Sequence, residues 1–136
     1  GFICCRMFTT REKLEANRGA YVAALKANIR AYELMQTNED ETIKYALQEL
    51  ETDEDTIRSQ IYEYGHIGFS PNPDVKDTDQ FFQAMVDIGY SEGNVDMKDY
   101  IDPTVFEDAL NELLQEDPDN EVYLQLQAED QATNQD

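Results

Sequence analysis

The sequence predicts a mainly α-helical protein of five to seven helices preceded by one N-terminal strand. Apolar residues recur at spacings of three and four along most of the chain, which is the period of an α-helix. Asn, Asp or Thr stands before each of these segments, where it can cap a helix. The 136 residues, of which 40% are apolar, provide enough material for the core of one domain.

The first segment, from Gly1 to Thr9, is apolar and β-favouring, with Phe2, Ile3 and Phe8 among its residues. It does not alternate strictly between apolar and polar residues, which is typical of a strand covered on both faces. Such a strand needs neighbouring strands to complete its backbone hydrogen bonds.

Two helical segments follow the predicted strand. Thr10 caps a short turn over residues 11–16, and Asn17 offers a second cap. Residues 18–37 then form the clearest helix of the sequence, with an apolar stripe of Tyr21, Val22, Leu25, Ile29, Tyr32 and Met35.

Two shorter helices are predicted next. The first begins after Asn38 with three acidic residues in its first turn, where the helix dipole favours them. The second begins at Thr52, in a capping-box variant that has Asp55 in place of the usual Glu or Gln.

The second half of the chain begins with a loop over residues 65–77, which glycine and proline interrupt. A helix over residues 78–88 follows and ends at Gly89. The next helix starts at Asp102 and Pro103, because Asp caps a helix and Pro suits its first position.

The pair Asp117 and Pro118 starts a short last helix in the same way. Residues 129–136 have no apolar anchor and are predicted to form a flexible acidic tail. We therefore expect residues 1–128 to form a single helix-rich unit.

The charge balance excludes several classes of partner. Thirty acidic residues face ten basic ones, so the formal charge is -20 and no basic cluster offsets it. Nucleic acid and anionic membranes are therefore excluded as partners. No apolar run is long enough to cross a bilayer, so no direct membrane insertion is expected. The N-terminus has neither an initiator Met nor a signal peptide, which predicts a chain processed or cut from a longer one.

No catalytic or metal-binding motif is present in the sequence. There is no Gly-rich phosphate loop and no nucleophile elbow. Cys4, Cys5 and a distant His66 make a poor zinc site, and residues 117–122 resemble a calcium loop but lack its glycine. We predict no enzymatic activity, no metal and no cofactor. The cysteines are interpreted as core residues, and His66 as a structural or exposed loop residue.

Arg6 is the candidate binding residue. A guanidinium inside an apolar strand must either be paired or face a cleft. Arg6 is therefore either a buried ion-pair partner or an anchor for an anionic ligand, and the desolvation argument favours neither.

Several short motifs follow one another in a recognisable order. They are Ile3-Cys4-Cys5-Arg6, Arg30-Ala31-Tyr32, Asn38-Glu39-Asp40-Glu41, Tyr62-Glu63-Tyr64-Gly65, Phe69-Ser70-Pro71-Asn72-Pro73-Asp74, Tyr100-Ile101-Asp102 and Pro118-Asp119-Asn120-Glu121. Their order resembles the C-terminal part of the substrate-binding proteins of ABC importers, in the branch for nitrate, sulfonates, taurine and thiamine precursors. The resemblance covers residues 2–126.

The resemblance implies a fragment of an α/β periplasmic-binding-protein fold of type II. A full-length member binds a small solute between two lobes in the extracytoplasmic cell envelope and delivers it to an ABC permease. Residues 1–10 match the strand that returns to the first lobe, so Arg6 is the one ligand-binding residue carried over. Because most of the cleft is missing, the resemblance implies a chain that does not bind solute alone.

The alternative function is that of a small acidic helical interaction module. An apolar strand without a sheet leaves backbone groups unpaired. Pairing with a second copy through Gly1 to Thr9 would satisfy them and produce a homodimer.

Overall fold

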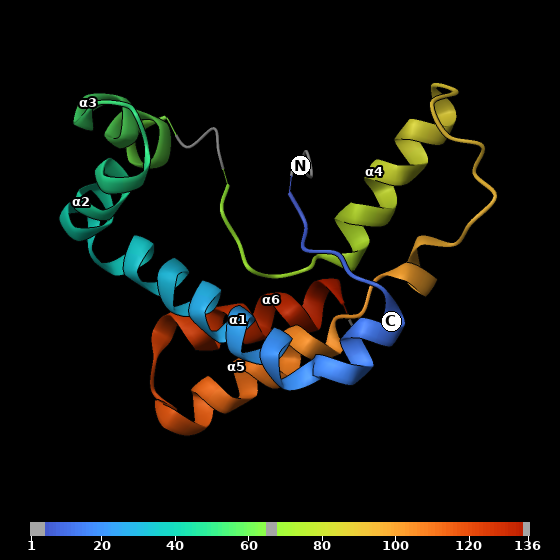
Figure 1. Ribbon diagram of the computed structural model, residues 1–136. Coiled ribbons are helices and arrows are strands. Elements are labelled where there is room, and N and C mark those ends of the chain that lie inside the picture. The colour runs from blue at the N-terminus through green and yellow to red at the C-terminus, as the bar shows by residue number, and fades with distance from the viewer. Residues whose placement is uncertain (1–4, 65–67, 135–136) are drawn as a thin grey trace. The chain divides into compact units, whose positions relative to one another are not determined.

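The computed structural model describes residues 5–64 and 68–134, and Figure 1 shows that they form helices joined by loops. No strand occurs among these residues, which confirms the mainly α prediction. By its internal contacts the chain divides into two compact units. Unit 1 comprises Gly1–Lys26 with Asn72–Asp136, and unit 2 comprises Ala27–Pro71. The sequence predicted one unit over residues 1–128. The division was not predicted because composition and helical period do not reveal which helices share a core.

The N-terminal segment, residues 5–10, is neither helix nor strand, and all of its residues are exposed. The described part of the predicted strand is therefore not a strand, and residues 1–4 lie outside the described range. A strand needs a neighbour to receive its backbone hydrogen bonds, and no other described segment supplies one.

Helix α1, Arg11–Thr37, begins in unit 1 and continues into unit 2. Asn17 has non-helical dihedrals, with φ of -133° and ψ of 26°, and its Nδ2 donates to the carbonyl oxygen of Lys13 at 3.1 Å. Asn competes in this way for backbone groups that a helix needs. The predicted break at Asn17 is therefore confirmed as a kink within one helix.

Unit 2 contains the end of α1 and three short elements. They are α2, Glu39–Glu49, α3, Glu54–Arg58, and the π-helix η1, Ser59–Glu63. Asn38 caps α2, as predicted, because its side chain accepts from the amide of Glu41. Asp53 rather than Thr52 caps α3 and accepts from the amide of Thr56 at 2.8 Å. Among the described residues of this unit, the buried side chains are Ile29, Thr42, Ile43 and Ile57.

Unit 1 contains the start of α1 and four elements from the second half of the chain. They are α4, Val75–Asp87, the 3-10 helix η2, Met97–Tyr100, α5, Thr104–Glu116, and α6, Glu121–Thr133. Helices α5 and α6 pack against each other (Figure 1). They provide most of the core, and their largest fully buried side chains are Phe106, Leu110, Leu113 and Leu126.

Helices α4 and α6 each begin three residues away from the predicted start. Helix α4 starts at Val75 instead of residue 78, because Asp74 adopts a φ of 46° and accepts from the amide of Asp77. Helix α6 starts after Asn120, three residues beyond Asp117, because the Asn120 side chain accepts from two backbone amides. Each helix therefore begins after the residue whose oxygen reaches the free amides.

The end of the chain also differs from the prediction. A flexible tail was expected from residue 129, but α6 continues to Thr133 and Asp130 is only 4% exposed. Long-range hydrogen bonds to the start of α4, described below, supply the anchor that the local sequence lacks. Residues 135–136 lie outside the described range.

Candidate functional site

Arg6, the predicted ligand residue, is exposed at the start of unit 1. Its Nη1 donates to the backbone oxygen of the adjacent Cys5 at 2.9 Å. Because Arg6 is exposed and its guanidinium remains hydrated, it is not a buried ion-pair partner. The interpretation as an anion anchor stays a prediction.

The cysteine and histidine predictions lie partly outside the described residues. Cys4 and His66 are not among them. Cys5 was expected in the core but is exposed, because the described part of its segment packs against no neighbouring strand.

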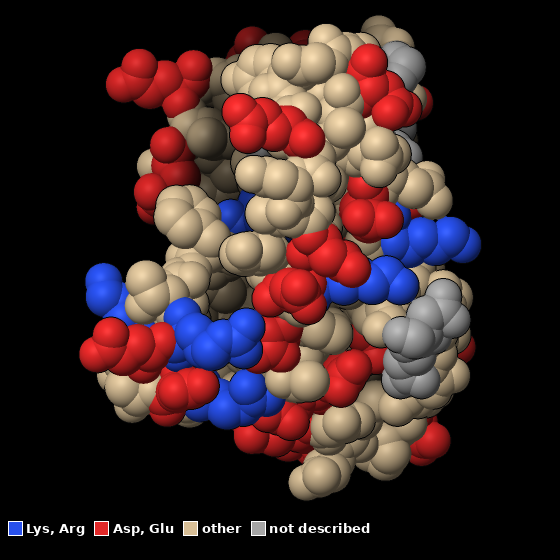
Figure 2. All heavy atoms as spheres, turned by 90° about the vertical axis from the view of Figure 1, so that its right-hand side faces the viewer, with Lys and Arg blue, Asp and Glu red and all other residues tan. Residues whose placement is uncertain are grey.

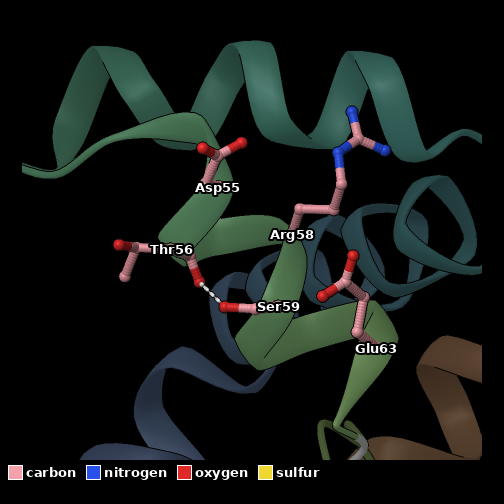
Figure 3. A pocket seen from close by; sticks show the side chains of 5 residues that line it. All are labelled: Asp55, Thr56, Arg58, Ser59 and Glu63. Atoms are coloured by element: carbon pink, nitrogen blue, oxygen red, sulfur yellow. Dashed lines mark hydrogen bonds between the residues drawn. The ribbon is translucent and has the colours of Figure 1, made fainter.

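A cavity of about 320 Å³ lies in unit 2, at the junction of α3 and η1. Figure 3 shows the five residues that line it, which are Asp55, Thr56, Arg58, Ser59 and Glu63. Ser59 Oγ donates to the carbonyl oxygen of Thr56 at 3.1 Å, where the helix changes from α to π geometry. A π-turn often marks a functional site because it widens the helix locally.

Arg58 is held by carboxylates around this cavity. Its guanidinium pairs with Glu39 and, at 3.7 Å, with Asp40 of α2, and it pairs with Glu54 one turn earlier at 2.9 Å. Figure 3 shows its side chain extending away from Ser59. The hydrogen bond to Glu54 raises the pKa of Arg58, and the nearby charges of Glu39, Glu54 and Asp40 add to this effect.

The chemistry of this cavity does not favour anion binding. Arg58 is already surrounded by carboxylates, and the two other charged lining residues, Asp55 and Glu63, are acidic. Ser59 Oγ donates its hydrogen bond to the backbone oxygen of Thr56. The cavity therefore has the character of a structural ion-pair site.

A second charged site joins α1 to α5 within unit 1. Arg18 pairs with Asp108 at 2.6 Å and donates to Thr104 Oγ1 at 2.9 Å. Lys26, two turns later on α1, pairs with Glu112 at 2.9 Å and Glu116 at 2.8 Å. The hydrogen bonds to Glu116 and Glu112 raise the pKa of Lys26. Two basic residues of α1, Arg18 and Lys26, are thus matched to acidic residues of α5.

A hydrogen-bond network joins the start of α4 to the end of α6. Asn134 Nδ2 donates to Asn72 Oδ1 and to Asp130 Oδ1, both at 2.7 Å, while its Oδ1 accepts from the amide of Val75 at 2.9 Å. Asn72 Nδ2 donates to Thr133 Oγ1 at 3.2 Å. Asn72 is only 5% exposed, so its polar groups require these partners. The network holds the start of α4 against the end of α6.

Three strongly exposed apolar side chains lie between the end of α4 and the end of η2. Ile88, Tyr90 and Tyr100 are 79%, 78% and 71% exposed. The predicted helix ran to residue 88, but α4 ends one residue earlier and no described element covers the side chain of Ile88. Ile88 and Tyr90 follow the end of α4, whereas Tyr100 is the last residue of η2, which lies beside the start of α4 (Figure 1).

Within the described range, no group of three or more His, Cys, Asp or Glu side chains is arranged to hold a metal ion. The calcium-like residues instead act as helix caps, since Asn120 Nδ2 donates to Asp117 Oδ2 while its Oδ1 caps α6. None of the helices in the described ranges is long and apolar enough to span a membrane.

Comparison with known proteins found no match for this chain among family models, curated proteins or solved structures.

Sequence reasoning missed the Arg58 site and the Asn72–Asn134 network. The spacing of Glu54 and Arg58 is a visible signal, because residues four apart on a helix are neighbours. Nothing in the local sequence indicates the partners from α2, or the pairing of two asparagines 62 positions apart.

Proposed function

We propose that this chain is the helix-rich C-terminal part of the solute-binding component of an ABC import system. Its solutes are small sulfonates, nitrate, taurine or thiamine precursors. The protein acts in the extracytoplasmic cell envelope, without enzymatic activity, and delivers its solute to a permease. The order of motifs from Ile3 to Glu121 supports this proposal.

The observation that carries the proposal is the exposed apolar segment before α1. Phe8 is 93% exposed and Met7 is 54% exposed, although both side chains favour burial. A segment of this composition is stabilised when it becomes a strand within a sheet. In the proposed receptor it would return to the sheet of the first lobe as part of an α/β fold.

Arg6 fits the same proposal as the ligand residue. A guanidinium offers several donors in one plane, which suits the oxygens of nitrate or a sulfonate. Once its segment entered a sheet, Arg6 would face the cleft between the lobes.

The coding sequence upstream of Gly1 and calorimetry on the full-length product test this proposal. We expect two α/β lobes upstream and binding of one of the four solute classes. Arg6→Gln should weaken that binding by about tenfold or more, because a charged hydrogen bond to the anion is lost. Lys44→Gln is the matched control on the exposed surface of α2 and should bind normally. A stop codon just upstream of Gly1 would refute the proposal.

A second measurement concerns the 136-residue chain by itself. Most of the cleft is contributed by other parts of such a receptor, so taurine, alkyl sulfonates and pyrimidine precursors should leave its Tm unchanged. A clear rise in Tm with any of them would contradict the expectation that the chain does not bind solute alone.

The second candidate function is self-association through the N-terminal segment. The same exposed Met7 and Phe8 favour it, because burial against a second copy would remove their apolar surface from water. A concentration-dependent sedimentation coefficient for the chain by itself would support this function.

A further inference from the structure

The end of α4 and the turn that follows it carry a projecting apolar surface, which we call the α4 tip. It consists of Met85, Ile88 and Tyr90. Met85 is half-buried, whereas Ile88 and Tyr90 are 79% and 78% exposed. Met85 and Ile88 are three positions apart at the end of the helix, so they share a face. Residues as exposed as Ile88 and Tyr90 project from the surface and do not line a groove.

Backbone hydrogen bonds hold Tyr90 beside this face. The amide of Tyr90 donates to the carbonyl oxygen of Met85 at 2.9 Å, and the amide of Gly89 donates to that of Val86 at 2.9 Å. Gly89 has a φ of 75°, so the helix ends in a Schellman motif. The motif places the backbone of Tyr90 next to that of Met85, and the three residues of the α4 tip therefore belong to one surface.

The connector after α4 packs on the opposite side of the helix. A Cβ at Gly93 would lie 2.8 Å from Val86 Cγ1, which shows how closely the connector approaches that side. Val86 and Ile88 are two positions apart, which separates their side chains by about 200° around the helix axis. The close contact at Gly93 therefore leaves the side that carries Ile88 uncovered.

The charge along this part of the chain is negative. Residues 77–97 contain five acidic residues and no Lys or Arg. Asp87 and Glu92, the acidic residues nearest in sequence to the α4 tip, are both exposed. Figure 2 views the molecule from the α4 side of Figure 1, and the described side chains in the upper part of that view are uncharged or acidic. The α4 tip is thus an apolar surface accompanied by negative charge.

The shape and the charge of the α4 tip determine the kind of partner that fits it. A projecting apolar side chain is buried most completely in a concave apolar pocket, and Tyr is among the residues that most often anchor protein interfaces. Carboxylates beside the anchor attract Lys or Arg at the rim of such a pocket. A second copy of this chain fits less well, because it carries a charge of -20 of its own and is repelled.

We infer that the α4 tip anchors a partner protein by entering an apolar pocket that Lys or Arg residues surround. Ile88 and Tyr90 enter the pocket, while Asp87 and Glu92 pair with its basic rim. The surface does not include Arg6 or the N-terminal segment, so the inference depends on neither of the two proposed functions.

Amino-substituted β-cyclodextrin is a small probe with the required chemistry, because ammonium groups ring its apolar cavity. Neutral and carboxylated β-cyclodextrin provide the same cavity with a neutral or a negative rim. Two-dimensional NMR on the full isotope-labelled chain follows the binding of all three. The amides of Met85, Ile88 and Tyr90 should shift with the amino form, which should bind about threefold to tenfold more tightly than the neutral form. This preference should shrink between about 50 and about 500 mM NaCl.

Variants separate the apolar contribution from the charged one. Ile88→Ser combined with Tyr90→Ser should abolish binding of the amino form at the α4 tip. Asp87→Asn combined with Glu92→Gln should retain binding and remove the preference for the amino form over the neutral one. Leu124→Ser is the matched control, since Leu124 is 45% exposed on α6, and it should change neither the affinity nor the preference. Circular dichroism checks that each variant keeps its helices.

Four results would overturn the inference. The first is the absence of shifts at the α4 tip with the amino form, and the second is equal affinity for the amino and neutral forms. The third is a larger shift at Phe8 or Tyr100, which would place the preferred site elsewhere. The fourth comes from sedimentation velocity: a wild-type dimer that is lost in Ile88→Ser with Tyr90→Ser would show that the occupant is a second copy.

Discussion

At the scale of single residues, oxygen-bearing side chains set the helix starts. Asn38, Asp53, Asp74 and Asn120 each accept a backbone N–H in the first turn of the helix that follows. The backbone hydrogen bond from Thr56 lowers the pKa of Asp53, because it favours the charged carboxylate. Residue type alone predicts that such caps exist, and the local backbone decides which of two neighbouring candidates acts.

The pKa of Glu107 on α5 is shifted in the opposite direction, upward. Burial raises its pKa, and the charges of Asp130, Asp108 and Asp102 raise it further. The folded state therefore binds this proton more tightly than the unfolded chain does. The ionised Glu107 destabilises the fold above its folded-state pKa, and this penalty disappears as the pH falls toward the unfolded-state value.

The first prediction is that Glu107→Gln raises the free energy of unfolding at neutral pH. The gain should shrink toward about pH 4, where the wild-type carboxyl is also neutral. Urea denaturation at the two pH values measures it. Glu15→Gln is the control, because it removes the same charge from the exposed surface of α1. Equal pH dependence for the two variants would contradict the prediction.

At the scale of elements, helix pairing in unit 1 combines an apolar core with charged edges. The core is formed by α5 and α6. The edge is formed by Arg18 and Lys26 of α1 against acidic residues of α5. Since the acidic partners of these pairs are about half exposed, they contribute less to stability than the core and more to the alignment of the helices.

The second prediction contrasts two leucines of α6. Leu126 is fully buried and Leu124 is 45% exposed. Leu126→Ala should lower the free energy of unfolding by about 2–5 kcal/mol, because it removes buried methyl groups and leaves a cavity. Leu124→Ala should cost about 0.5 kcal/mol or less, as is usual for exposed sites. Chemical denaturation of both variants provides the measurement, and equal losses would show that α6 does not pack as described.

At the scale of the whole molecule, the main electrostatic effect on stability comes from the net charge. A charge of -20 on a folded chain of this size brings like charges together, and the unfolded chain relieves the repulsion by expanding. Ion pairs such as Arg18–Asp108 act in the opposite direction but are few.

The third prediction is that NaCl raises the Tm of the chain. Screening should weaken the net repulsion more than it weakens the exposed ion pairs, so Tm should increase between about 50 and about 500 mM salt. Differential scanning calorimetry at low protein concentration, where monomer predominates, separates this effect from dimer formation. A Tm that falls with salt would mean that the ion pairs outweigh the repulsion.

Local features of the structure could be predicted from sequence because their causes lie within one helical turn. The mainly α fold, the kink at Asn17 and the cap at Asn38 belong to this class. The Arg58 site and the exposure of Ile88 do not, because each depends on which segment lies nearby in space. The α/β receptor fragment and the role of Arg6 remain predictions.

By itself, the sequence determined that this chain is helical, strongly acidic and interrupted at Asn17, since these properties follow from residue type and short-range spacing. Only the tertiary structure decided where α4 starts and α6 ends. Asn72 and Asn134 satisfy each other's hydrogen bonds across 62 positions, and their burial makes those bonds necessary. The same long-range packing also decided which apolar side chains remained uncovered at the end of α4.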